Sequence, residues 1–454
     1  MNSKLKILCL ICSVVAALTL ITCIAKAQNY VSTYAGDGTN AYADGDTATC
    51  KFKGPFGMCI DLQGNLYIAD NSNHRIRKIS TDGTVTTLAG TGVAGYLDGP
   101  GSTAKFNAPS DLCADANGNI YVSDFQNQYI RKIAPDGTVS TIAGSGIAGY
   151  MDGASNVAEF NYPRGICIDT QGNLFIADSW NHRIRKIDAS GNVTTLAGGG
   201  DTIGVQSQGN YRDASDTSAR FNVPCGMSID ADGNLYVADA YNHRIRKVTP
   251  EGVVSTIAGT GDIGSSAGGY EDGSIDVARF NTPTEVYIDQ QGNIYVGDSY
   301  NNRVRLVANS EVSTVAGNGI AGYVDGIDTA AEFKSPRGIV EDISGNHLYV
   351  CDNSNHVIRK ITLEIATGIE SETSAIPFSI FPNPASDHVF ISSPNQLKEI
   401  FMMDVLGRKM LSQSFESSVF STTLNLQDIP TGYYLLQMKT VSDKVVTTKL
   451  MISH

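Results

Sequence analysis

Short apolar runs alternate with polar turns along most of the chain. Residues 163–198 show the pattern: apolar runs at 163–169, 174–177, 183–187 and 193–198 are separated by turns that contain Gly, Asn or Asp. β-Branched and aromatic residues are frequent in these runs, and none of the runs is long enough for a helix, which is typical of strands joined by tight turns. The pattern predicts four short antiparallel strands in each such unit.

This four-strand unit occurs six times. The aspartate that follows the second run recurs at intervals of 54, 54, 61, 59 and 54 residues, as Asp70, Asp124, Asp178, Asp239, Asp298 and Asp352. Repeats of this length with four strands each are typical of a β-propeller with one unit per blade. The sixth unit lacks a fourth strand, but residues 31–36 match the fourth-strand sequence of the others. We therefore expect a six-bladed propeller over residues 28–364, whose last blade is completed by strand 31–36.

The segment after each of these aspartates carries a recognisable motif. It reads Asn-His-Arg-Ile-Arg-Lys from Asn73, Asn181 and Asn242, and it departs from this wording in blades two, five and six. The motif resembles NHL repeats, in the variant common in secreted bacterial proteins. The resemblance implies an NHL-type propeller but hardly constrains activity, because such propellers serve as platforms for peptides, proteins or RNA and their relatives include lactonases and lyases.

The first 27 residues predict a signal peptide. Lys4 and Lys6 precede an apolar run from Ile7 to Ile24, and Ala25-Lys-Ala27 fits a cleavage site. No other stretch is apolar enough to span a bilayer, so we expect no transmembrane segment in the mature chain. The formal net charge of −13 disfavours nucleic acid as a partner. The Arg-x-Arg-Lys triplets, one per blade, are expected to lie on solvated strand faces.

The cysteines and histidines of the repeats are expected to have structural roles. Cys59, Cys113 and Cys167 occupy equivalent positions in successive blades. The ~10 Å spacing of packed sheets exceeds the ~5.5 Å Cα separation of a disulfide, and it also argues against a thiolate metal cluster. The motif histidines are expected to bond or pack within their own blades; they are His74, His182, His243 and His356.

The positions at which the blades differ are the candidates for function. In the two positions after each blade's proline, arginine appears in blades three and six, and a carboxylate replaces glycine in blades two and five. These opposite pairs should lie near one mouth of the central channel, and the loop after the second strand adds aromatic side chains on the same face. Aromatic rings beside charged groups suit sugars or peptides. The candidate ligand-binding residues are Arg164, Arg337, Asp111, Glu285, Phe125, Trp180, Tyr241 and Tyr300.

A purely structural role for these residues is also compatible with the sequence. In that case the two arginines pair with neighbouring carboxylates, and the aromatic side chains pack among the long loops that join the blades. The longest of these loops run from Gly198 to Tyr211 and from Gly259 to Tyr270. These two insertions are the other places where we expect a partner to be recognised.

The repeats stop after Ile361, and a polar connector at 365–375 leads to a region of short alternating strands over residues 376–454. Such strands fit a small Ig-like β-sandwich. The Phe381-Pro-Asn-Pro opening, the Gly407-Arg408 turn and the Pro430-Thr-Gly-Tyr-Tyr434 strand are similar to the C-terminal sorting domain of the type IX secretion system. The resemblance implies export through the periplasm, the type IX machinery as a partner, and release or attachment at the outer-membrane surface. An ordinary Ig-like binding module is the alternative.

Two functions from different classes remain. The first is a non-enzymatic, secreted or cell-surface binding protein whose propeller captures a glycan, peptide or protein. The second is a metal-dependent enzyme of the lactonase or lyase type, with Asp111 and Glu285 as candidate ligands in the channel. These two carboxylates are expected on opposite sides of the ring, which is a poor geometry for binding one ion at ~2.4 Å per bond. The chain also contains no recognised catalytic motif. The sequence therefore favours binding, and it assigns no catalytic residue, metal or cofactor.

Overall fold

The computed structural model describes residues 28–199, 210–261, 264, 267–363, 379–381, 385–404, 409–441 and 445–453. The predicted signal peptide and connector lie outside these residues, as does part of the loop between blades three and four. The chain forms two compact units, which divide between Ile365 and Ala366. Within the described ranges, no helix has the length and apolarity needed to cross a membrane.

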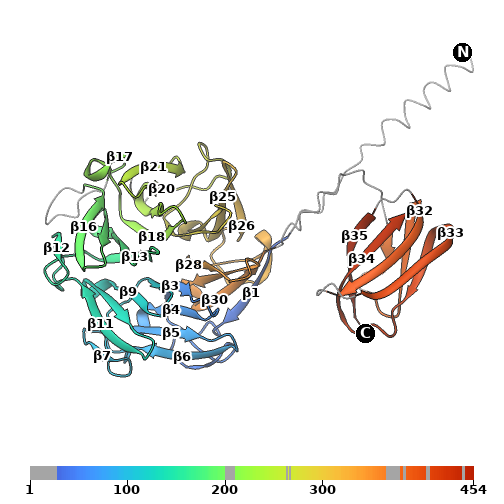
Figure 1. Ribbon diagram of the computed structural model, residues 1–454, viewed down its shortest axis with the longest axis horizontal. Helices are drawn as coiled ribbons and strands as arrows, with labels where there is room; N and C mark the ends of the chain where they lie inside the picture. Colours follow the sequence, from blue (N-terminus) through green and yellow to red (C-terminus); the bar gives the residue numbers. More distant parts are fainter. Residues whose placement is uncertain are drawn as a thin grey trace, which may run out of the picture. The chain divides into compact units, whose positions relative to one another are not determined.

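Six antiparallel sheets form the blades of a propeller, which confirms the predicted number (Figure 1). The innermost strands are β3 (Pro55–Ile60), β8 (Leu112–Ala114), β13 (Pro163–Ile168), β18 (Pro224–Ile229), β23 (Pro283–Ile288) and β28 (Pro336–Glu341). The second strands are β4 (Leu66–Asp70), β9 (Ile120–Asp124), β14 (Leu174–Asp178), β19 (Leu235–Asp239), β24 (Ile294–Asp298) and β29 (His347–Asp352). The third strands are β5 (Arg75–Ile79), β10 (Tyr129–Ile133), β15 (Arg183–Ile187), β20 (Arg244–Val248), β25 (Arg303–Ala308) and β30 (Val357–Thr362).

The fourth strands come from five blades and from the N-terminal segment of the chain. They are β6 (Thr84–Ala89), β11 (Thr138–Ala143), β16 (Asn192–Ala197), β21 (Val253–Ala258), β26 (Glu311–Ala316) and β1 (Tyr30–Ala35). Strand β1 pairs with β30 in antiparallel register, from Tyr30 opposite Thr362 to Ala35 opposite Ile358. Figure 1 shows this blue strand beside the last strands of the propeller. The first and last parts of the propeller therefore share one sheet.

A fifth strand of two residues lies on the outer edge of every blade, where the sequence predicted four strands. These strands are β2 (Gly45–Asp46), β7 (Gly99–Pro100), β12 (Gly153–Ala154), β17 (Ala214–Ser215), β22 (Gly273–Ser274) and β27 (Gly326–Ile327). Each belongs to the loop that enters the blade, so the loop first crosses the outer rim and then reaches the innermost strand. The 3-10 helices are η1 (Asn71–Asn73), η2 (Phe125–Asn127), η3 (Ser179–Asn181), η4 (Asp216–Ser218), η5 (Ala240–Asn242), η6 (Ser299–Asn301), η7 (Asp328–Ala330) and η8 (Asn353–Asn355).

In each blade, a fully buried arginine joins the second strand to the incoming loop. In blade three, the Arg185 guanidinium lies 2.7 Å from the buried Asp178 carboxylate and 2.6 Å from Asp152, which is 39% exposed. It also donates to the carbonyl oxygens of Glu159 and Met151 in the incoming loop. The expectation that the basic triplets are solvated is therefore wrong for their second arginine, because its charge is paired inside the blade. The equivalent arginines are Arg77, Arg131, Arg246, Arg305 and Arg359.

The residue after each motif asparagine links its blade to the next one. His74 Nδ1 accepts a hydrogen bond of 3.0 Å from the backbone N–H of Ala108, which precedes the proline of blade two. Gln128 and Asn302 accept the equivalent N–H in blades two and five. The expectation that the histidines act within their own blades is therefore wrong, since the others also bond to the following blade; they are His182, His243 and His356.

The C-terminal unit contains β31 (Ser379–Phe381), β32 (His388–Asp404), β33 (Lys409–Asn425), β34 (Gly432–Thr440) and β35 (Val445–Ile452). These strands form one sheet in the order β31-β32-β34-β35, and β33 also pairs with β32. The register of β32 and β33 shifts between Ser392 and Leu397. Side chains from both halves of β32, such as Ile391 and Met402, share one buried cluster. The sheet therefore curls around its own core, in agreement with the predicted all-β class.

Candidate functional site

The entrance to the central channel at the start of the innermost strands is called the mouth below. It is formed by the residue that follows each blade's proline: Phe56, Ser110, Arg164, Cys225, Thr284 and Arg337. In five blades the innermost strand begins at this proline, a position that tolerates the missing N–H donor. The register then shifts within three residues, for example between Pro163 and Ile166. The shift keeps the first side chains of the strand out of the regular alternation of the sheet.

Arg164 and Arg337 come from opposite blades and lie beside the same aromatic ring. The Arg337 Cζ atom is 4.1 Å from the centroid of the Phe56 ring, and the Arg164 Cζ atom is 5.9 Å from the same centroid. Arg164 also lies 5.2 Å from the ring of Phe125. The structure thus brings the two predicted arginines, which come from opposite blades, beside one Phe56 ring.

The charges of these two arginines are not neutralised by carboxylates. Among the described residues, no carboxylate oxygen lies within 4.0 Å of either guanidinium group, and both Nε atoms are buried without a hydrogen-bond acceptor. Arg164 Nη1 donates to the Cys225 Sγ atom at 3.4 Å. Burial, together with the positive charge of Arg164, lowers the pKa of Arg337 to about 10. The structural alternative of charge pairing is therefore wrong for the part of the chain that the structure describes.

A row of aromatic rings extends from this arginine pair into blade three. Phe125 lies 4.9 Å from the ring of Tyr162, which in turn lies 5.7 Å from the ring of Trp180. Tyr162 is the residue before the proline of blade three, and sequence reasoning missed it because it compared only the positions after each proline. Comparing the preceding position as well finds it, since the other blades have Gly54, Ala108, Val223, Thr282 and Ser335 there.

The two remaining predicted aromatic residues are placed differently. Tyr241 packs against the buried cluster between blades four and five, and its carbonyl oxygen accepts a hydrogen bond from the Gly264 N–H. This placement agrees with the structural alternative. Tyr300 is 57% exposed on the blade-five loop. Of the four predicted aromatic residues, Phe125 and Trp180 thus belong to the row beside the arginine pair.

The predicted carboxylates lie one residue deeper and are almost completely buried, with Asp111 7% and Glu285 8% exposed. Asp111 Oδ2 accepts a hydrogen bond of 3.0 Å from the Ile166 N–H of the next blade, and Glu285 Oε1 accepts one of 3.2 Å from the Val286 N–H. Burial raises the pKa of Asp111 to about 7. Burial, and secondly the charge of Asp111, raises the pKa of Glu285 well above its usual range.

Close packing of the innermost strands explains why the other blades have glycine at this depth. A Cβ atom at Gly338 would lie 2.7 Å from the Phe56 carbonyl oxygen of the next blade. At Gly57 and Gly226 it would occupy the space of the Asp111 and Glu285 carboxyl groups, respectively. The carboxyl groups therefore use room that two neighbouring glycines leave free.

A cavity of about 230 Å³ follows the channel below the mouth and touches all six innermost strands. Asp111 and Glu285 line it, together with the thiols of Cys59, Cys113 and Cys167. These thiols are free, as expected, and burial raises the pKa of each one. Within the described ranges, no three His, Cys, Asp or Glu side chains are grouped so that they could hold a metal ion.

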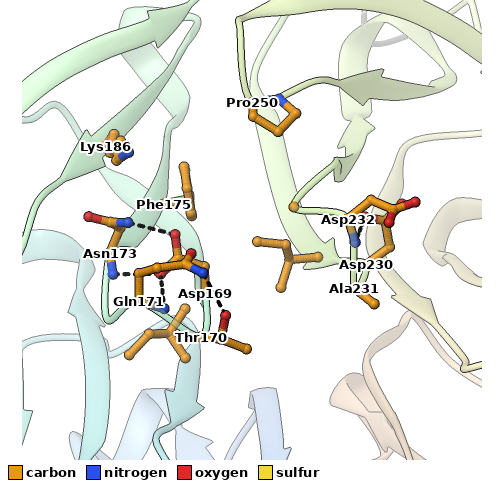
Figure 2. Close-up of a pocket in the computed structure, with 13 residues that line it drawn as sticks. Asp169, Thr170, Gln171, Asn173, Phe175, Lys186, Asp230, Ala231, Asp232 and Pro250 are labelled. Atoms are coloured by element: carbon orange, nitrogen blue, oxygen red, sulfur yellow. Dashed lines mark hydrogen bonds between the residues drawn. The ribbon is translucent and has the colours of Figure 1, made fainter.

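A second cavity of about 450 Å³ lies between blades three and four, at the opposite end of the strands from the mouth (Figure 2). Figure 2 shows the turns around Asp169 and Asp230 on its two sides. Both carboxylates are already bonded within their own turns, to Asn173 and Asn234. Lys186 stands beside the Phe175 ring at 5.8 Å. The two carboxylates that line this cavity thus stabilise their own turns. None of the residues that line it was singled out by the sequence analysis.

Four family models match parts of the chain. Residues 379–453 match the secretion system C-terminal sorting domain, and residues 52–79 match the NHL repeat. Residues 205–377 match the teneurin NHL domain, and residues 93–262 match the SMP-30/gluconolactonase/LRE-like region.

Similar proteins and structures are found for the propeller part. NHL repeat-containing protein 2 of Bos taurus is 30% identical over 75% of this chain, and SUPPRESSOR OF QUENCHING 1 of Arabidopsis thaliana is 29% identical over 62% of it. The chain spans 49% and 28% of the length of these relatives. An auxiliary nutrient binding protein of Bacteroides thetaiotaomicron has a TM-score of 0.56 at 18% identity, covering 75% of this chain and 77% of that one. The structural likeness concerns the fold.

Proposed function

We propose that this chain, which is an NHL-repeat β-propeller protein with a C-terminal sorting domain of the type IX secretion system, is an exported binding protein. The sorting domain indicates type IX secretion to the cell surface or the extracellular space. The predicted signal peptide supplies the first step, passage into the periplasm. The propeller then acts outside the cell, where it captures a glycan, a peptide or another protein at the mouth.

The observation that carries this proposal is the pair of arginines without carboxylate partners. Arg164 and Arg337 hold two positive charges beside the Phe56 ring, and their buried Nε atoms lack acceptors. Buried polar groups are normally hydrogen-bonded, and a bound anion would supply acceptors for these two guanidinium groups. The aromatic row from Phe125 to Trp180 adds apolar area at the same place. The fold neighbour from Bacteroides thetaiotaomicron is itself described as a nutrient binding protein, which supports a binding role.

The test is binding of the purified chain without its signal peptide to glycan and peptide arrays. We expect binding by the wild-type protein and its loss in the double variant Arg164→Ala, Arg337→Ala. The matched control is the double variant Lys186→Ala, Lys247→Ala, which removes two positive charges from neighbouring blades away from the mouth. If the arginine variant binds as the wild-type protein does, the site lies elsewhere and the proposal for the mouth is wrong.

An enzyme of the lactonase or lyase type is the second candidate, because residues 93–262 match the gluconolactonase family model. Its groups would be Asp111 and Glu285, which line the channel cavity and whose pKa values are raised by burial. Repeating the arrays with a chelator distinguishes the two functions. Binding or turnover that a chelator abolishes favours the enzyme, whereas binding that survives it and depends on the arginines favours capture.

A further inference from the structure

We propose that the arginine pair binds the carboxylate of an acidic sugar, and that the ligand of the mouth is accordingly a saccharide that contains uronic acid or a related carboxylated residue. This inference rests on the proposed function of the mouth and names the class of its ligand. Three features of the mouth support it: the charges, the aromatic row and the close packing of the innermost strands.

The two positive charges of the arginine pair favour an anionic ligand. Arg337 stacks on Phe56 at 4.1 Å, which covers one face of its guanidinium group and leaves the N–H edge for acceptors in its plane. The second guanidinium, Arg164, approaches the same ring, so two like charges lie close together in a partly desolvated place. An oxyanion that accepts from both groups relieves this repulsion and satisfies their donors, with the short charge-assisted hydrogen bonds that arginine forms with carboxylates.

The aromatic row selects a flat, partly apolar ligand. Phe125 lies 5.2 Å from Arg164, and the row continues through Tyr162 to Trp180. Aromatic faces offer large contact areas, and the tyrosine and tryptophan also present a polar group at the ring edge. A sugar ring fits such a surface because its C–H face packs on the ring while its hydroxyl groups reach water or polar edges. The carboxylate of an acidic sugar can then point to the arginine pair.

Each innermost strand is the end strand of its sheet, but the neighbouring innermost strands lie too close to it for a peptide to add there. At the depth just below the mouth, Gly165 and Gly338 approach the next blade so closely that no Cβ atom fits. An incoming strand therefore has no room to pair there, and a peptide loses the main-chain hydrogen bonds that provide affinity in strand addition. This favours a saccharide over a peptide.

Calorimetric titration of the full mature chain tests the inference. The probes are a uronic acid oligomer, the same oligomer with its carboxylates reduced to alcohols, an acidic pentapeptide, and inorganic phosphate. We expect the uronic acid oligomer to bind and the reduced oligomer to bind at least tenfold more weakly. The Arg164→Ala, Arg337→Ala variant should lose about tenfold to a hundredfold in affinity for the acidic oligomer, and the Lys186→Ala, Lys247→Ala control should match the wild-type protein. Thermal unfolding of each variant verifies that it is folded.

The other outcomes overturn the inference in distinguishable ways. Equal binding of the acidic and reduced oligomers, lost in the arginine variant, leaves the mouth as a binding site but contradicts recognition of a carboxylate. Binding of the peptide or of phosphate, without binding of the uronic acid oligomer, contradicts a saccharide as the ligand. If none of these probes binds while the arrays show arginine-dependent binding of another ligand, the inference is wrong and the proposed function stands. If the arrays also fail, both are wrong.

Discussion

One side-chain position links every blade to its successor, and three residue types fill it. His74, Gln128 and Asn302 differ in shape, but each accepts the backbone N–H of the residue before the next proline. The accepting residue and the donating residue both have left-handed backbone conformations, with φ of 53° at His74 and 52° at Ala108. What the position requires is therefore an acceptor at the right distance from an αL backbone, which histidine, asparagine and glutamine all provide.

Substitutions of His74 test this requirement. His74→Leu leaves the Ala108 N–H without an acceptor, so we expect the free energy of unfolding of the propeller to fall by about 1–3 kcal/mol. His74→Gln restores the arrangement of blade two, and its loss should be smaller than about 1 kcal/mol. Urea unfolding followed by fluorescence measures both. Equal losses in the two variants would show that the acceptor is not what the position contributes.

The buried carboxyl pair predicts an unusual pH dependence. Since burial raises the folded pKa of Asp111 to about 7 and that of Glu285 well above its usual range, the folded state binds more protons than the unfolded state above pH ~4. Their contribution to stability is complete below this pH and is lost as the pH rises through about 7. Per proton, the slope is about 1.4 kcal/mol for each pH unit.

The variant Asp111→Asn, Glu285→Gln removes this contribution while keeping the size of the side chains. We expect it to gain stability relative to the wild-type protein as the pH rises from 5 to 8, measured by urea unfolding at each pH. The comparison isolates the pair, because the histidines whose pKa values are lowered by burial are present in both proteins. A constant difference across this range would show that the two carboxyl groups do not titrate as their burial implies.

At the scale of the element, the buried arginine of each blade determines which parts of the repeat can vary. The Arg185 side chain joins the end of β14, through Asp178, to the loop that carries β12, through Asp152. Strands and incoming loop are thus held by one side chain, and the Tyr150 ring covers the same guanidinium at 5.0 Å. The repetition of Tyr and Asp in the incoming loops follows from this arrangement, in which the tyrosine packs on the buried arginine.

The two carboxylates of this arginine should contribute unequally. Asp178→Ala removes the partner that is completely buried, and we expect a loss of about 3–5 kcal/mol in the free energy of unfolding, because the buried guanidinium then keeps only its partly exposed partner. Asp152→Ala removes the partner that is 39% exposed, where solvent screens the charge, and the expected loss is about 1 kcal/mol. Thermal or urea unfolding of the two variants in parallel provides the measurement. Equal losses would mean that burial does not decide the strength of this network.

At the scale of the whole molecule, the periodicity of the sequence was sufficient to predict the number of blades and the all-β class. The details it did not predict depend on curvature. The two-residue outer strands are too short to leave a pattern, and the pairing of Tyr42 with Thr87 arises only when the loop wraps the rim. For the candidate site, the arginines could be singled out because they break the repeat. Their approach to the same Phe56 side chain could not be predicted, because it depends on the radius of the propeller and on side-chain conformation.

The joining of β1 to β30 predicts that the propeller fails as a whole when its first strand is removed. Deleting residues 29–36 exposes the edge of β30 and uncovers the cluster that contains Val31, so we expect aggregation in size-exclusion chromatography and a lower midpoint of thermal unfolding. The matched control removes residues 379–454, which belong to the other compact unit, and should leave the propeller transition in place. An unchanged midpoint after deletion of the first strand would contradict a stabilising role for it.

The shared sheet of the first and last blades also sets an order of events during synthesis. Strand β1 is made first, but its partner β30 is made only after five complete blades. Until then the N-terminal segment has no place in the fold, and the contact that closes the ring joins residues at nearly the largest separation in the propeller, which slows folding. The contact that closes the ring therefore cannot form before the strands of the last blade have been made.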